Sequence, residues 1–220
     1  MITLEKVVKT YYNGDCPTPA LKGIDLTIEA GEYVAIMGTS GSGKSTLLNI
    51  IGGMDTLTEG AYHYNDIAVH ELKGNDLHLF RKQHVSFVFQ QFALMNRYTV
   101  FENVELPLLA KGVPKKERKE IVMKQLERLG IADLAKKLPV HISGGQQQRC
   151  AIARALASDN SIILADEPTG ALDKNTGLEI MKLLGEINRQ GKTVIIITHD
   201  PNIASMTDRI LHLEDGCIQE

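Results

Sequence analysis

The sequence is poor in several residue types that specialise a protein for a particular environment. Among its 220 residues there is no tryptophan, aromatic residues make up 5%, and only three residues are cysteine. Cys16, Cys150 and Cys217 are odd in number and far apart in the chain, a pattern that fits neither a disulfide framework nor a zinc site. The cysteine content therefore indicates reduced thiols in a cytosol.

The sequence also lacks an excess of one charge and a long apolar run. Its 24 Lys and Arg residues face 27 Asp and Glu residues, for a formal net charge of −3. This balance argues against a protein that binds nucleic acid through bulk positive charge, so any recognition of phosphate must be local. No uncharged apolar run approaches the roughly 18 to 20 residues of a transmembrane helix, and we expect no membrane span in this chain.

What is present is an ordinary globular composition, with 43% hydrophobic and 23% charged residues. A chain of 220 residues is one large domain or a domain with an inserted subdomain. Short apolar runs rich in β-branched residues alternate with helical patterns, which is typical of a parallel sheet covered by helices. The predicted strands are Tyr33–Met37, Val85–Phe89, Ile162–Ala165 and Val194–Thr198. The fold class is therefore α/β.

Other segments extend this α/β core. Apolar and polar residues alternate at Ile24–Ile28, which predicts a half-exposed strand, and Ile210–Leu213 begins a predicted last hairpin. Asp173–Gln190 has the pattern of a crossover helix. Between Phe92 and Ser143 the strand signal disappears, and Lys115–Leu129 has apolar residues along one side of a helix. We interpret the region between Phe92 and Ser143 as an inserted helical segment.

The clearest motif is G-x-x-x-x-G-K-[ST], which follows the strand Tyr33–Met37 and precedes the helical run Thr46–Ile51. Glycines let backbone N–H groups turn toward a phosphate, and the amino end of the helix adds partial positive charge. We expect Lys44 to bridge the β- and γ-phosphates and Ser45 to place its hydroxyl on Mg²⁺. The motif predicts nucleotide binding by Gly38, Thr39, Ser40, Gly41, Ser42, Gly43, Lys44, Ser45 and Thr46.

Two consecutive carboxylates, Asp166 and Glu167, end the apolar strand that begins near Ile162. Ligands of α/β sheets bind at the carboxyl ends of the strands. Because consecutive strand residues face opposite ways, we expect different roles for the two. Asp166 is the candidate partner of Mg²⁺, and Glu167, just past the strand, is the candidate group that polarises a water beside the γ-phosphate.

A second anion site is predicted where Ser143, Gly144, Gly145 and Gln146 open another helix. Ser143 is a suitable helix cap, and the two glycines expose backbone N–H groups. The phosphate loop around Lys44 already accounts for one triphosphate, and the two sites lie on opposite sides of the helical insert in sequence. A second molecule would resolve this conflict.

Together these residues resemble the ABC transporter ATPases, and the resemblance covers essentially all 220 residues. It implies one ABC ATPase domain over residues 1–220. Residues 1–91 and 144–220 would form a P-loop NTPase core, with a parallel sheet and an N-terminal antiparallel β subdomain, and residues 92–143 a helical insert. It also implies a head-to-tail homodimer in which the Ser143 segment of one copy faces the γ-phosphate held by the Lys44 loop of the other.

The resemblance assigns roles to four more residues. Gln90 is similar to the family's glutamine that contacts Mg²⁺ and the attacking water, and Asp173 to its aspartate that acts across the dimer. His199 is similar to the histidine that senses the γ-phosphate. Tyr11 matches the aromatic residue on which adenine stacks, although Tyr12 is adjacent and would serve as well on composition.

The resemblance further implies ATP and Mg²⁺ as cofactors, a separate transmembrane permease as partner, no nucleic acid, and a peripheral location on the cytoplasmic face of the cell membrane. Phe87–Phe92 and Glu102–Leu108 resemble ATPases of lipoprotein-release, macrolide-efflux and antimicrobial-peptide exporters. An ATPase driving a signalling or cell-division complex in the membrane stays open as an alternative. The Phe92–Val113 stretch would be either a docking groove for the permease or part of the core.

Overall fold

The described residues form two sheets, and the first of them is antiparallel. The computed structural model describes residues 1–14 and 16–219. The four strands lie in the order β2-β1-β4-β5, and each neighbouring pair is antiparallel. Their bounds are β1 Ile2–Asn13, β2 Cys16–Ile28, β4 Glu59–Tyr64 and β5 Ile67–Ala68. At its end β2 alternates buried and exposed residues from Ile24 to Ile28, which confirms the predicted half-exposed strand.

The second sheet has six strands in the order β10-β9-β3-β8-β7-β6. Its strands are β3 Tyr33–Met37, β6 Val85–Phe89, β7 Ile162–Asp166, β8 Thr193–Ile197, β9 Arg209–Glu214 and β10 Cys217–Gln219. The pairs from β9 across to β6 are parallel, and β10 forms the final hairpin with β9. The predicted parallel sheet and hairpin are confirmed, with the bounds of β8 shifted by one residue.

Helices form the connections and the segment between residues 92 and 143. The α-helices are α1 Lys44–Ile51, α2 Asn75–His84, α3 Val100–Ala110, α4 Lys115–Arg128, α5 Gly144–Ala157, α6 Lys174–Asn188 and α7 Pro201–Ala204. Single 3₁₀ turns lie at Val69–Glu71, Ala132–Leu134 and Pro139–His141. Both motif helices begin earlier than their apolar patterns, because Lys44 and Gly144 already belong to the first turns. In the part of the chain that the structure describes, no helix is long and apolar enough to cross a membrane.

The six-stranded sheet divides the core into two apolar clusters. Along β8, Ile195 and Ile197 pack with the inner face of α1 and with the antiparallel sheet, whereas Val194 and Ile196 pack with α5 and α6 on the other face. Successive strand residues point to opposite faces, so a strand covered on both sides must be apolar throughout. Burial of each such side chain contributes about 1.5–3 kcal/mol, and the central strands therefore read as continuous apolar runs.

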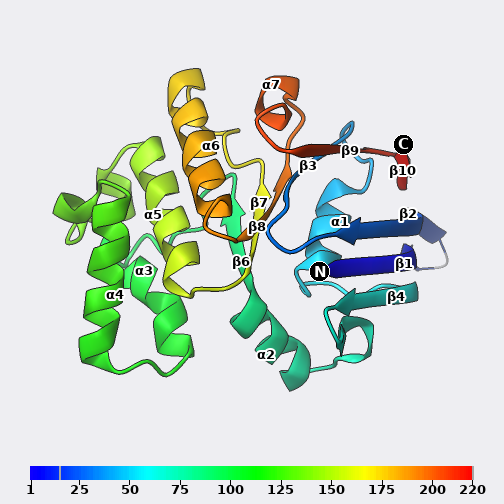
Figure 1. Cartoon of the computed structure of the whole chain (residues 1–220), viewed down its shortest axis with the longest axis horizontal. Coiled ribbons are helices and arrows are strands. Elements are labelled where there is room, and N and C mark those ends of the chain that lie inside the picture. The colour runs from blue at the N-terminus through cyan, green and yellow to red at the C-terminus, as the bar shows by residue number, and fades with distance from the viewer. Residues whose placement is uncertain (15, 220) are drawn as a thin grey trace.

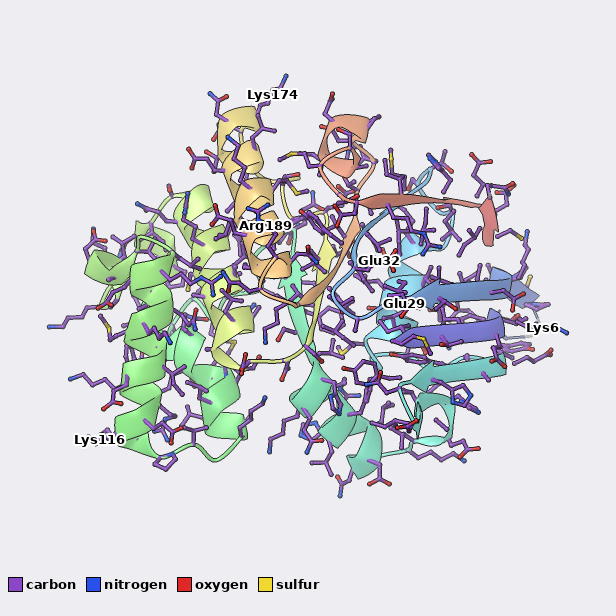
Figure 2. All side chains as sticks on the ribbon, viewed as in Figure 1. Lys6, Glu29, Glu32, Lys116, Lys174 and Arg189 are labelled. Atoms are coloured by element: carbon purple, nitrogen blue, oxygen red, sulfur yellow. The ribbon has the colours of Figure 1, made fainter. Side chains whose placement is uncertain are left out.

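The two peripheral parts of the fold lie at opposite ends of the long axis. Figure 1 shows α3, α4 and α5 at one end and β1, β2 and β4 at the other, with α1 between the antiparallel sheet and the central strands. Lys116 on α4 and Lys6 on β1 mark these two ends in Figure 2. The carboxyl ends of β3, β6, β7 and β8 meet at one edge of the central sheet, because these strands are parallel. This edge carries the candidate site.

Candidate nucleotide-binding site

A cavity of about 620 Å³ lies at the carboxyl edge of the central sheet. Its walls come from the loop between β3 and α1, the ends of β6 and β7, and the residue after Thr198. The sequence-predicted residues that it brings together are Gly38, Thr39, Ser40, Gly41, Gly43, Lys44, Ser45, Thr46, Gln90, Asp166, Glu167 and His199. Residues from four separate segments of the chain therefore meet around one space.

The loop between β3 and α1 is shaped around its glycines and its lysine. Gly43 has φ 103°, and a Cβ added there would lie 2.5 Å from the carbonyl oxygen of Ala20. Only glycine therefore fits at this position. The Lys44 ammonium donates to the carbonyl oxygens of Gly38 at 2.8 Å and Thr39 at 2.7 Å. These contacts hold a positive charge inside the loop, at the amino end of α1.

Ser42, the remaining residue of the predicted phosphate loop, lies beneath the cavity surface. The residue is 2% exposed, and its hydroxyl oxygen has no hydrogen-bond partner among the described residues. Its backbone is fixed, because its N–H donates to Thr39 and its carbonyl accepts from Gly216. Ser42 therefore contributes to the loop through its backbone hydrogen bonds and does not line the cavity.

Asp166 and Glu167 both line the cavity, although consecutive residues within a strand face opposite ways. Asp166 is the last residue of β7, but Glu167 leaves the strand with φ 46° and donates its N–H to the carbonyl of Ile197. The alternation of strand side chains stops where the strand stops, so Glu167 turns to the same side. Burial and the neighbouring Glu167 raise the pKa of Asp166, and Lys44 opposes this shift.

Glu167 is linked to His199 across the cavity. The Glu167 Oε1 and His199 Nδ1 atoms are 2.7 Å apart, and the glutamate side chain is 17% exposed whereas the histidine side chain is 74% exposed. Gln90 approaches from the end of β6, and its amide lies so close to Gly170 that an added Cβ there would be 2.7 Å from Gln90 Nε2. Carboxylate, imidazole and amide groups therefore line the same cavity as Lys44.

Tyr11 lies at the edge of this region. Its hydroxyl donates to Asp55 Oδ2 at 2.7 Å and lies 3.5 Å from Thr46 Oγ1, and Thr46 does line the cavity. Tyr11 is 42% exposed and Tyr12 69% exposed. The contact with Thr46 distinguishes the two tyrosines, because it joins Tyr11 to the first turn of α1.

The second predicted anion site lies in a separate cavity of about 450 Å³. Ser143, Gly144, Gly145, Gln146 and Asp173 all line it. Ser143 caps α5 by accepting from the Gln146 N–H at 3.3 Å, and the Ser143 N–H donates to Gln146 Oε1 at 2.9 Å. Asp173 caps α6, and the hydrogen bonds from Thr176 lower its pKa. The two cavities share none of their lining residues, so one chain carries two separate candidate sites.

Comparison with known proteins decides the family. The model of the family described as "ABC transporter" matches residues 21–170. The chain belongs to the ABC transporter family. The predictions of an ABC ATPase and of a P-loop α/β fold are thereby confirmed.

Several relatives cover this ABC ATPase from end to end. The ABC transporter ATP-binding protein YvrO of Bacillus subtilis is 49% identical over 98% of this chain and 94% of its own length. The ABC transporter ATP-binding protein MJ0796 of Methanocaldococcus jannaschii is 49% identical over 100% of this chain and 95% of its own length. The macrolide export ATP-binding/permease protein MacB of Rhodopseudomonas palustris is 45% identical over 99% of this chain, which spans 33% of MacB.

Solved structures agree with these relatives. A dimeric structure of a post-hydrolysis state of the ATP-binding cassette MJ0796, bound to ADP and Pi, matches with a TM-score of 0.92 and 46% identity, over 100% of this chain and 97% of that chain. The cbiO1 protein of Clostridium perfringens, part of the ABC transporter complex cbiONQ, matches with a TM-score of 0.89 and 31% identity. The match covers 100% of this chain and 86% of that chain.

One residue of this ABC ATPase that sequence reasoning missed is Arg154 on α5. Its guanidinium donates to the carbonyl oxygens of Ala93 at 2.6 Å and Phe92 at 3.0 Å. Phe92 and Ala93 have φ values of 61° and 47°, a left-handed conformation that is rare outside glycine. Arg154 thus holds the loop that follows Gln90. No local pattern signals this contact, because the partners are 61 and 62 residues apart.

A third cavity, of about 400 Å³, lies between α2, α3, α5 and β6. Its apolar lining includes Met54, Phe87, Phe89, Ala93, Pro107 and Ala110. Phe87 and Phe89 stack with their ring planes 2° apart. The stretch from Phe92 to Val113 supplies both core and groove, because Val100, Val104 and Leu108 are buried on one side of α3 while Pro107 and Ala110 face the cavity. We refer to this cavity as the apolar groove.

Proposed function

We propose that this chain is the ATP-hydrolysing subunit of a membrane ABC transporter and works as a nucleotide-sandwich homodimer. The observation that carries the proposal is the presence on one chain of two separate cavities that each have groups suited to bind phosphate. The cavity at Lys44 has a phosphate loop, and the cavity at Ser143 has the capped amino end of α5, where backbone N–H groups favour an anion. In a head-to-tail pair of chains, the cavity at Lys44 of each copy would face the cavity at Ser143 of the other, which would give two complete sites.

Nucleotide binding is assigned to the cavity at the carboxyl edge of the sheet. The loop Gly38–Ser45 and Thr46 would hold the phosphates, and Tyr11 would stack on adenine. Mg²⁺ is usually held by one or two protein oxygens together with substrate phosphates. Ser45, Gln90 and Asp166 offer a hydroxyl, an amide oxygen and a carboxylate on the same cavity, so these residues fit Mg²⁺ bound with ATP. The ion would neutralise charge on the phosphates.

Hydrolysis is assigned to Glu167 as general base. Its carboxylate lies in the same cavity as Lys44 and can accept a proton from a water near the terminal phosphate. His199 is within hydrogen-bonding distance of this carboxylate and can also donate to a phosphate oxygen. Gln90 would orient the water. Gln90 would therefore position the water that Glu167 activates, and His199 would position Glu167 and the terminal phosphate.

The dimer supplies the second half of each site. In the proposed pair Ser143, Gly144, Gly145 and Gln146 of one copy cover the nucleotide bound at Lys44 of the other, and Asp173 also acts across the interface. The dimeric structures of MJ0796, at 46% and 47% identity, support this arrangement. We also propose that residues 1–220 form one ABC ATPase domain, with 1–91 and 144–220 as its core and 92–143 as its helical insert.

The membrane partner is proposed to be a separate permease. MacB, an ATP-binding/permease protein, has two thirds of its length outside the match, since this chain spans 33% of it. The apolar groove is the surface we assign to a helix of the permease, which would place the ATPase at the cytoplasmic face of the cell membrane. The identities of 44–47% with MacB proteins favour an exporter of the lipoprotein, macrolide or antimicrobial-peptide type.

Sedimentation velocity tests the shared site. We expect the Glu167→Gln variant to sediment as a dimer with Mg²⁺ and ATP and as a monomer without nucleotide. Adding Ser143→Arg, which places a bulky cation at the α5 amino end, should return the ATP-bound protein to a monomer. A protein that binds ATP and stays monomeric in every case would overturn the proposed dimer.

A further inference from the structure

Tyr11 is held by two charged side chains from different parts of the chain. Its hydroxyl donates to Asp55 Oδ2 at 2.7 Å, and Lys9 Nζ donates to Asp55 Oδ1, also at 2.7 Å. The same Lys9 Nζ lies 4.8 Å from the centroid of the Tyr11 ring, well within the range of a cation–π interaction. The ring is therefore fixed at its tip by Asp55 and over one face by Lys9.

Both charged side chains are themselves fixed. Lys9 is 9% exposed and donates a further hydrogen bond to the Thr56 carbonyl at 2.7 Å. Asp55 Oδ1 also accepts from the Thr56 N–H at 2.7 Å, so both oxygens of this carboxylate are in use. Burial acts to raise the pKa of Asp55, but the hydrogen bonds from Lys9, Tyr11 and the Thr56 N–H, together with the charge of Lys9, outweigh it, and its pKa is lowered. The carboxylate is thus held in its charged form.

This network ties the strand that carries Tyr11 to the helix that begins in the phosphate loop. The Asp55 N–H donates to the carbonyl of Asn49 in α1 at 3.2 Å. The Tyr11 hydroxyl lies 3.5 Å from Thr46 Oγ1, two residues after Lys44 in the same helix. The distance between Tyr11 and the phosphate loop is therefore set by contacts at two points along α1.

We propose that Lys9 and Asp55 are positioning residues for the base of the nucleotide. They hold Tyr11 with one face against the Lys9 ammonium, while a side chain that is 42% exposed keeps surface for adenine to stack on. Neither residue touches the phosphates in this scheme. Their contribution is to order the aromatic ring before ATP arrives, which lowers the entropic cost of stacking. The inference rests on the proposed nucleotide site and adds two residues to it.

The test separates the base from the phosphates. Isothermal titration of the full chain measures binding of Mg²⁺-ATP and of Mg²⁺-tripolyphosphate, which has three phosphates and no base. We expect Lys9→Met to weaken ATP binding by about 2- to 10-fold, the cost of ordering one aromatic side chain, and to leave tripolyphosphate binding unchanged. In a Tyr11→Ala background, Lys9→Met should have no further effect on ATP, because Lys9 acts through the ring.

A matched control is Asp159→Asn, which removes an exposed ion pair with Lys192 of 2.6 Å, away from all the residues of the network. It should change neither affinity. Asp55→Asn is the second variant, and melting temperatures verify that each variant folds. Equal losses for ATP and tripolyphosphate, no loss for ATP, or an undiminished effect of Lys9→Met in the Tyr11→Ala background would each overturn the positioning role. Failure of the unmodified protein to bind ATP would instead overturn the proposed function.

Discussion

Glu167→Gln is the substitution that examines the proposed chemistry most directly. It replaces one carboxylate oxygen by an amide nitrogen in a side chain of the same size, so the cavity keeps its shape. The amide oxygen can still accept a hydrogen bond from His199, 2.7 Å away in the unmodified protein. What is lost is the negative charge and the ability to take a proton. ATP binding should therefore persist.

The expected loss follows from the role assigned to the carboxylate. General-base catalysis contributes about 10²–10⁴-fold to a rate, which at about 1.36 kcal/mol per tenfold corresponds to about 2.7–5.4 kcal/mol of transition-state stabilisation. The substitution also changes the electrostatic surroundings of Asp166. Burial and the charge of Glu167 raise the pKa of Asp166, so removing that charge keeps Asp166 more firmly ionised. The proposed Mg²⁺ partner is thus retained while the base is lost.

The assay is release of phosphate from saturating Mg²⁺-ATP, with ATP affinity measured separately by titration. Glu120→Gln is the matched control, because Glu120 is an exposed glutamate on α4, and this variant should hydrolyse ATP at the unmodified rate. We expect Glu167→Gln to lose between two and four decades in kcat with little change in affinity. A loss below about tenfold would refute the assignment of Glu167 as general base.

Two further predictions concern the dimer and the loop after Gln90. Lys44→Ala and Ser143→Arg should each be inactive alone, and mixing the two proteins should restore part of the ATPase activity, because one site of each mixed dimer is intact; no recovery in confirmed heterodimers would argue for sites within one chain. Arg154→Met should lower the free energy of unfolding in urea by about 1–3 kcal/mol, the usual net contribution of one or two hydrogen bonds from a charged group, and an unchanged midpoint would show that solvent replaces Arg154.

The phosphate loop and the central sheet were predictable because their signals are local. A glycine pattern between a strand and a helix leaves few other conformations for Gly38–Ser45, and the carboxyl end of β7 follows from an apolar run that ends in two acids. The direction of Glu167 was not predictable in the same way. It depends on a positive φ at one residue and on a hydrogen bond to Ile197 in a neighbouring strand.

The contacts of Tyr11 were not predictable from the sequence. Adjacent tyrosines at positions 11 and 12 are equivalent by composition, and the contacts of Tyr11 with Thr46 and Asp55, 35 and 44 residues away, separate them. Lys9 gives no sign in the sequence of being buried over an aromatic ring. Such pairings are decided by how β1 packs on α1, and residue spacing within one element carries no information about them.

By itself the sequence determined the α/β class, the phosphate loop, the helix cap at Ser143 and the strands of the parallel sheet, because each depends on residues within one turn or one strand. The tertiary structure alone decided that two anion-binding ends of one chain lie in different cavities, that Arg154 holds the loop after Gln90, and that Lys9 and Asp55 converge on Tyr11. The last two features join residues more than 40 positions apart in the chain, and such contacts exist only once the sheets and helices have packed.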